Sequence, residues 1–207
     1  RLEPSISEFG GFIDKYIGDS IMAIYPSNTD SALTSAINML KVLNEYNERH
    51  PELAPIHIGI GLNSGLLMLG IVGAEHHMEG TVISDVVNVA SRTEGLTKTY
   101  SAELLITEET YKRLRNPAMY SIRRLDTVLA KGKSKPITIY EVFDSDVESA
   151  KFLKTQTKTD FEQGAAYFYQ ENYHEAQKTF EHVLRINPSD KAAQLYLERC
   201  NIPNKLK

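Results

Sequence analysis

The stretch FIDKYIGDSIMAIYP, Phe12 to Pro26, sets the fold at the start of this chain. Two short apolar runs flank the pair Gly18-Asp19, and this pattern predicts a β-hairpin closed by a tight turn. Lys15 stands among isoleucines in the first arm, and Asp19 stands in the turn itself. A plain surface hairpin would accept any polar residue at either place, so both positions are candidates for a binding role.

The composition is that of a globular protein. The 207 residues are 24% charged and 42% hydrophobic, which suits one or two domains with a core. A net charge of −4 argues against a general nucleic-acid binder, because such proteins carry a basic stripe. The single cysteine, Cys200, cannot form an intramolecular disulfide and suits the reducing cytoplasm. The longest apolar run, LLMLGIVGA, is too short to span a bilayer. The chain starts without Met, and we expect a fragment whose upstream region could carry a membrane anchor.

Hairpins and helices follow one another after the opening stretch. Ser27 and Asn28 predict the cap of a helix that runs to about Asn47. The segment IHIGIGLNSGLLMLGIVG, residues 56–73, predicts a second hairpin that turns at residues 63–65. Its glycines predict the close approach of another backbone or of a ligand.

The elements up to residue 143 complete a first domain. We expect a loop or arm at 74–80, a helix at about 84–98, a short strand at 103–107, a short helix at 108–114, and two strands within 120–143 joined by a basic turn at 131–135. This order predicts the α+β class with a mostly antiparallel sheet.

The chain changes character beyond the last predicted strand. Polar, strand-free sequence up to Lys158 predicts a linker, and we divide the chain into a domain at 1–146, a linker at 147–158 and a small all-α helical hairpin at 159–202. Thr157–Asp190 fits one tetratricopeptide repeat. One repeat is rarely stable alone, so we expect this segment to dock on the first domain, on further repeats or on another protein. The small, aromatic and terminating positions of the repeat are filled by Gly164, Tyr167, Tyr173, Ala176, Phe180 and Pro188.

Two pairs of polar residues could carry chemistry. An aspartate at a hairpin tip, such as Asp19, can reach Mg²⁺, which commonly takes one or two protein carboxylates besides phosphates and water. Lys15 could bring its ammonium to a base or a phosphate. Asn88 and Arg92 share one face of the predicted helix, where an amide and a guanidinium suit a ribose oxygen and a phosphate. By spacing alone, surface residues without a ligand explain each pair better.

Three motifs together resemble the class III nucleotidyl cyclase catalytic domain. They are GGFIDKYIGDSIMAIYP at 10–26, GTVISDVVNVASRTEGLTKTY at 80–100 and AKGKSKPITIYEVF at 130–143, and the resemblance runs in order over nearly all of residues 1–146. It implies a ferredoxin-like, palm-type sheet with helices, whose first strand and helix precede this point. It also implies conversion of ATP to cyclic AMP and pyrophosphate.

The resemblance implies a role for each candidate residue. Asp19 matches the second of two aspartates that hold two Mg²⁺ or Mn²⁺ ions. Lys15 and Thr81 match the pair that selects the purine, and lysine with threonine goes with ATP, whereas guanylate cyclases tend to carry Glu and Cys. Asn88 matches the asparagine that positions the ribose, and Arg92 the arginine that stabilises charge on the reacting α-phosphate.

The resemblance also implies a residue that binds the terminal phosphates and a dimeric assembly. Lys131 matches the lysine that reaches the terminal phosphates, although Lys133 and Lys135 offer nearly equivalent charge. In the family, sites form at a head-to-tail dimer interface, where one subunit gives the aspartates and the other gives the remaining groups. We therefore expect a homodimer with two equivalent sites.

Two features depart from the family pattern. The first metal-binding aspartate is absent from these residues, so we expect the chain as given to be inactive or nearly so. A basic residue that many relatives carry before the threonine is replaced by the loop at 75–78, with His77 nearest its place. A neutral histidine holds phosphate less well, so activity would be weak or would rise at lower pH. A metal site at His76 and His77 is disfavoured, because adjacent strand residues point apart and no Cys or further His stands at ligand spacing.

Three alternatives remain beside an adenylate cyclase. A guanylate cyclase conflicts with Lys15 and Thr81. A non-catalytic cyclase-like module that binds nucleotide or only dimerises would not need Asp19, Asn88 and Arg92. A diguanylate cyclase shares a palm-like sheet, but this chain lacks its acidic Gly-Gly-Asp/Glu-Glu-Phe turn.

Overall fold

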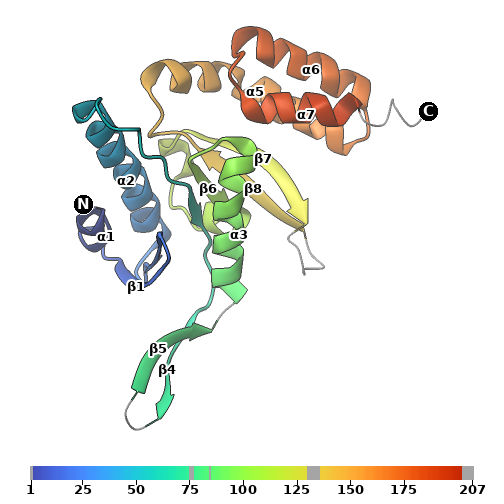
Figure 1. Cartoon of the computed structure of the whole chain (residues 1–207). Coiled ribbons are helices and arrows are strands. Elements are labelled where there is room, and N and C mark those ends of the chain that lie inside the picture. Colours follow the sequence, from blue (N-terminus) through green and yellow to red (C-terminus); the bar gives the residue numbers. More distant parts are fainter. Residues whose placement is uncertain (1, 75–76, 84, 130–135, 202–207) are drawn as a thin grey trace.

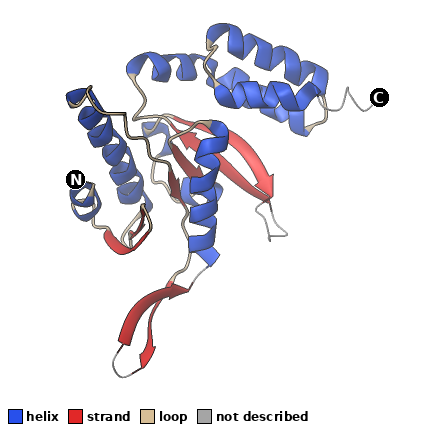
Figure 2. Ribbon diagram, in the orientation of Figure 1, coloured by secondary structure: helices blue, strands red, loops and turns tan. Residues whose placement is uncertain are grey.

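The computed structural model describes residues 2–74, 77–83, 85–129 and 136–201. A mixed sheet lies at the centre of the chain, a two-stranded arm projects away from it, and three helices form a tail at the opposite end (Figures 1 and 2). The strands are β1 Phe12–Ile17, β2 Ser20–Ile24, β3 Ile60–Leu62, β4 Met68–Ala74, β5 His77–Ile83, β6 Leu104–Thr107, β7 Ile122–Leu129 and β8 Pro136–Val142. The helices are α1 Glu3–Ser7, α2 Thr29–Arg49, α3 Asp85–Tyr100, α4 Glu108–Tyr111, the 3₁₀ turn η1 Pro117–Met119, and the tail helices α5 Glu148–Tyr169, α6 Tyr173–Ile186 and α7 Lys191–Asn201.

The opening stretch forms the predicted hairpin. Strands β1 and β2 pair antiparallel up to Ile17 and Ser20, and Gly18 takes a φ of +61° in the turn, a conformation that costs glycine nothing. The hairpin is tied to helix α2, since the Tyr25 hydroxyl lies 2.5 Å from the Ser35 hydroxyl. Helix α2 begins at its predicted cap, where Asn28 accepts a hydrogen bond from the Ser31 amide at 2.7 Å.

The central sheet has the strand order β3-β6-β8-β7, in which β3 and β6 are parallel and the other pairs antiparallel. Strand β6 is buried throughout, and its successive side chains serve two cores because they alternate across the sheet. Leu104 and Ile106 pack with Leu33 and Leu40 of α2. Leu105 packs on the other face, in the cluster that includes Tyr100 of α3 and the tail helices. The mostly antiparallel α+β class is confirmed.

The predicted second hairpin, turning at residues 63–65, is wrong. Strand β3 instead pairs with β6, and β4 pairs antiparallel with β5 from Met68–Ile83 to Ala74–His77, so β4 and β5 form the projecting arm of Figure 1. Local spacing could not distinguish the two pairings, because parallel partners are distant in sequence.

The glycine in strand β3 marks the close backbone approach that the sequence predicts. A Cβ atom at Gly61 would collide with the backbone nitrogen of Glu94 and would lie 2.5 Å from the carbonyl oxygen of Ala90. Helix α3 therefore lies directly on β3, because glycine alone leaves room for its backbone.

The tail is a bundle of three helices. Helix α5 begins at Glu148, so most of the segment expected as a linker at 147–158 is helical. Gly164 of α5 faces the Phe180 ring of α6, and Phe161 meets Phe180 edge to face at 5.6 Å. Within the described residues, no helix is both long and apolar enough to cross a membrane.

Candidate active site

The hairpin presents a partly exposed lysine and an exposed aspartate. The side chain of Lys15 is 39% exposed, and its ammonium lies 3.4 Å from the Asp14 carboxylate. Asp19 is exposed in the turn between β1 and β2. Since β1 has a register shift between Ile13 and Lys15, the strand is irregular beside the lysine, as is common next to binding sites.

Helix α3 presents the second pair. Asn88 and Arg92 are both exposed, and their spacing of four residues puts them on one face of the helix. The opposite side is fixed to the sheet through the buried residues Thr93 and Thr97. The amide and the guanidinium are therefore exposed on a helix whose other side is held by the sheet.

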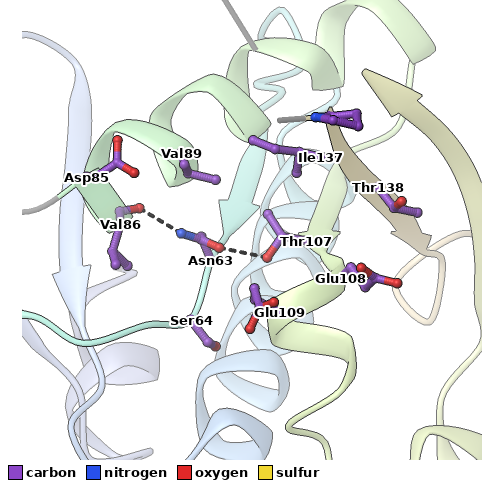
Figure 3. Close-up of a pocket in the computed structure, with 11 residues that line it drawn as sticks. Asn63, Ser64, Asp85, Val86, Val89, Thr107, Glu108, Glu109, Ile137 and Thr138 are labelled. Carbon is purple, nitrogen blue, oxygen red and sulfur yellow. Dashed lines mark hydrogen bonds between the residues drawn. The ribbon is translucent and has the colours of Figure 1, made fainter. Parts of the chain in front are cut away.

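A residue that sequence reasoning missed anchors the start of this helix. The amide of Asn63 donates to the Val86 carbonyl at 2.9 Å, and its oxygen accepts from the Thr107 hydroxyl at 2.8 Å (Figure 3). Asn63 thus links the end of β3, the end of β6 and the first turn of α3. Its position directly after a strand is the available signal, but the local sequence pattern favours a hairpin turn at this place.

A cavity of about 270 Å³ lies beside this anchor, between the first turn of α3, the end of β6 and the start of β8 (Figure 3). Asp85, Glu108 and Glu109 line it together with hydroxyl groups and aliphatic side chains. The charged side chains of this described lining are carboxylates, so the lining itself offers no cation to a triphosphate.

The two pairs remain on different elements. In the described part of the chain, no hydrogen bond or ion pair joins Lys15 or Asp19 to Asn88 or Arg92. Thr81 lies in β5 of the arm, opposite Gly70 of β4. Lys131, Lys133 and Lys135 lie outside the described residues. Strands β7 and β8 flank that segment as predicted, since β7 ends at 129 and β8 begins at 136.

Asp19 is the candidate residue through which this chain would bind a divalent cation. Its exposed carboxylate suits Mg²⁺, which can take one protein carboxylate when substrate phosphates and water supply the other ligands. Among the described residues, no group of three or more His, Cys, Asp or Glu side chains could hold a metal ion. These residues therefore fit an ion bridged to a substrate better than a preformed metal centre.

Comparison with known proteins identifies related chains. Residues 14–160 match the family model for the "Adenylate and Guanylate cyclase catalytic domain". The chain is 39% identical over 204 residues to "Adenylate cyclase, terminal-differentiation specific" of Dictyostelium discoideum, covering 95% of this chain and 10% of that protein. It is 47% identical over 146 residues to "Adenylate cyclase" of Anabaena cylindrica, covering 67% and 29%.

A solved structure agrees with these sequence relatives. The fold is similar to that of a bacterial light-regulated adenylyl cyclase, with a TM-score of 0.62 and 25% identity, covering 78% of this chain and 47% of that one. This chain thus spans less than a third of either curated relative. The match of 204 residues to the Dictyostelium protein is long enough to include the helical tail.

Proposed function

Because this chain belongs to the adenylate and guanylate cyclase catalytic domain family, we propose that it is the catalytic domain of an adenylate cyclase. It converts ATP to 3′,5′-cyclic AMP and pyrophosphate. The observation that carries the proposal is the exposed pair Asn88 and Arg92 on α3, together with Asp19 exposed at the hairpin turn. Exposed polar side chains such as these are available to a substrate.

The reaction is an intramolecular phosphoryl transfer. The ribose 3′-hydroxyl loses its proton to water as its oxygen attacks the α-phosphorus, the bond from that phosphorus to the oxygen bridging the α- and β-phosphates breaks, and pyrophosphate leaves. Asn88 holds the ribose so that its hydroxyl faces the α-phosphate. Arg92 donates hydrogen bonds to the α-phosphate oxygens, where charge changes most in the transition state. Lys131 neutralises the terminal phosphates.

Asp19 is the proposed metal ligand of this chain. A bound Mg²⁺ or Mn²⁺ would activate the 3′-hydroxyl and neutralise the leaving pyrophosphate. The first metal-binding aspartate of the family has no counterpart in residues 1–207, so we propose that these residues alone are inactive or nearly so. Activity assays therefore use the chain extended by its native upstream sequence, here called the extended chain.

Lys15 and Thr81 select the base. Adenine offers a ring acceptor at N1 for the ammonium and an amino group at N6 that can donate to the hydroxyl. Guanine presents N1–H and O6 at these places, so the lysine ammonium would face another donor, whereas the Thr81 hydroxyl can donate to O6 as well as accept from N6. A polar group left unpaired under a bound ligand costs about 1–3 kcal/mol, so the mismatch at Lys15 favours ATP over GTP.

The site is shared between two copies of the chain. One copy gives Asp19, and the other gives Lys15, Thr81, Asn88 and Arg92. The hairpin and the arm expose large apolar side chains, and Tyr16, Ile17, Leu66 and Met68 are each at least 60% exposed. Such patches mark protein–protein contacts, which supports a homodimer through these elements.

The tail and the compartment belong to the same proposal. We take α5 and α6 as one tetratricopeptide-like repeat, whose further face could bind a protein partner. A cytoplasmic location suits the single buried Cys200, which stays reduced there.

Direct product analysis tests the proposed activity. The extended chain is incubated with ATP or with GTP, each with Mg²⁺ and with Mn²⁺, and cyclic nucleotides are separated and quantified. We expect cyclic AMP from ATP and at least about tenfold less cyclic GTP from GTP, because the Lys15 ammonium would face a donor on guanine. Equal rates with both nucleotides would reject the assigned base selection. No product from a folded dimer would favour the non-catalytic module.

A further inference from the structure

The tail is attached to the sheet through buried charges. Arg123 of β7 is 2% exposed, and its guanidinium donates to Glu141 of β8 at 2.6 Å and to Asp190, just before α7, at 2.5 Å. Lys154 of α5 donates to the second oxygen of Glu141 at 2.6 Å. Removal of Arg123 would leave the buried Asp190 carboxylate without this cation, so the contact between the tail and the sheet depends on this pairing.

A further buried carboxylate, Asp126 of β7, accepts hydrogen bonds from residues of three helices. Asp126 is 3% exposed, and it accepts hydrogen bonds from Tyr196 of α7 at 2.7 Å and from Arg199 of α7 at 2.6 Å. It also accepts from Tyr169, the last residue of α5, and from Tyr100, the last residue of α3. We call these five residues the Asp126 cluster.

At neutral pH the Asp126 carboxylate is ionised, and the other four residues of the cluster donate hydrogen bonds to it. Burial alone would raise the pKa of Asp126, but the hydrogen bonds from Tyr100, Tyr169, Arg199 and Tyr196 outweigh it and hold that pKa below its usual value. Burial and the neighbouring carboxylate raise the pKa of Tyr196 and of Tyr100 above the usual range of tyrosine. The phenols therefore remain donors to a carboxylate.

The helix that enters this cluster is the one that carries the proposed catalytic pair. Tyr100 ends α3 eight residues after Arg92, a separation of about 12 Å along the helix axis. Asn63 holds the first turn of the same helix through the Val86 carbonyl. Helix α3 is thus fixed at both ends. Strands β3 and β6 hold its N-terminal end, and β7 and the tail hold its C-terminal end.

We propose that the tail is a positioning element of the catalytic domain, and that Arg199 and Tyr196 are positioning residues that orient Arg92 and Asn88 through Asp126 and Tyr100. This inference rests on the proposed roles of Arg92 and Asn88. Helices α5 and α7 supply the contacts to β7, and α6 lies on the side of the tail away from the sheet (Figure 1).

The variant Arg199→Met in the extended chain tests this. The Arg199 side chain is 30% exposed, so the change removes one donor of Asp126 without opening a buried cavity. The matched control is Lys178→Met on α6, which removes one positive charge from a surface pair with Glu175. We expect kcat to fall about tenfold and KM for ATP to change less than about threefold, because Arg92 acts mainly on the transition state.

Further variants separate positioning from stability. Tyr196→Phe removes the hydroxyl and keeps the ring, which stacks on Phe180 at 4.8 Å, and we expect the same fall in kcat. Arg199→Lys restores part of it, since a donor returns. All rates are measured well below the melting transition of each variant, followed by circular dichroism. Unchanged kcat with only a lower melting temperature would overturn the inference and leave the tail a stabilising element.

The proposed function and this inference can fail separately. If the unaltered extended chain forms no product, the proposed function fails, and the coupling is measured by hydrogen exchange instead. Faster exchange in α3 of Arg199→Met than of Lys178→Met supports the coupling, and equal exchange overturns it. If the unaltered chain is active and both Arg199→Met and Tyr196→Phe match it in kcat, only the positioning inference fails.

Discussion

We expect Asp19→Asn to lower the rate of ATP cyclisation by the extended chain at least about a thousandfold, because loss of the proposed metal-binding carboxylate would remove the ion that would neutralise the leaving pyrophosphate. Asp19 is exposed at the end of the hairpin, so an asparagine there leaves the packing intact. The measurement is the initial rate of cyclic AMP formation at saturating Mg²⁺, with circular dichroism to confirm that the variant is folded.

The control for this variant removes the same charge elsewhere. Glu48→Gln changes an exposed carboxylate near the end of α2, outside the proposed site, and its rate should stay within about twofold of the unaltered chain. An Asp19→Asn protein that keeps more than a tenth of the activity would show that this carboxylate is not a metal ligand.

We expect the double variant Lys15→Glu with Thr81→Cys to shift nucleotide preference from ATP towards GTP. Glutamate can accept from the guanine N1–H, whereas the lysine ammonium cannot. Two matched contacts at about 1–3 kcal/mol each predict a change of about a hundredfold or more in the ratio of kcat/KM for the two nucleotides. The ratio is measured by competition between ATP and GTP in one reaction.

The controls for this pair are the conservative and the single changes. Thr81→Ser keeps the hydroxyl and should keep the preference for ATP. Lys15→Glu alone should lose activity with ATP without gaining full activity with GTP, since Thr81 still stands where guanylate cyclases tend to carry Cys. Selectivity that does not change in the double variant would reject the roles of both residues in base selection.

Local patterns predicted the elements whose partners are close in sequence. The hairpin at 12–26 follows from two apolar runs around a Gly-Asp turn, and α2 follows from the Asn28 cap and its apolar spacing. The pair β7 and β8 follows from the alternation on either side of a basic turn. In each case the deciding interactions lie within about twenty residues.

Pairings between distant segments were not visible in the sequence. Gly61 of β3 was expected to meet another backbone or a ligand, but nothing local shows that it meets α3 or that β3 pairs with β6. Arg123 and Asp126 look like surface charges of a half-exposed strand, yet they are 2% and 3% exposed. Their partners, Asp190 and Tyr196 among them, come some seventy residues later.

The site was predicted by resemblance more than by spacing. Asn88 and Arg92 stand exposed on one helix as expected, but the same spacing occurs on many surface helices. Asn63 was missed, because a residue that orients a helix through backbone contacts leaves no chemical signature in the sequence. The role of each candidate residue stays a prediction that the variants above test.

Mixing two inactive variants tests the shared site most directly. Asp19→Asn and Arg92→Ala, each in the extended chain, should be nearly inactive alone. In a mixed dimer, the Arg92→Ala copy gives an intact Asp19 and the Asp19→Asn copy gives an intact Arg92, so one site is complete. Random pairing then restores about a quarter of the unaltered activity. Mixed dimers, verified by two different affinity tags, that recover no cyclic AMP synthesis would contradict a catalytic site shared between two copies.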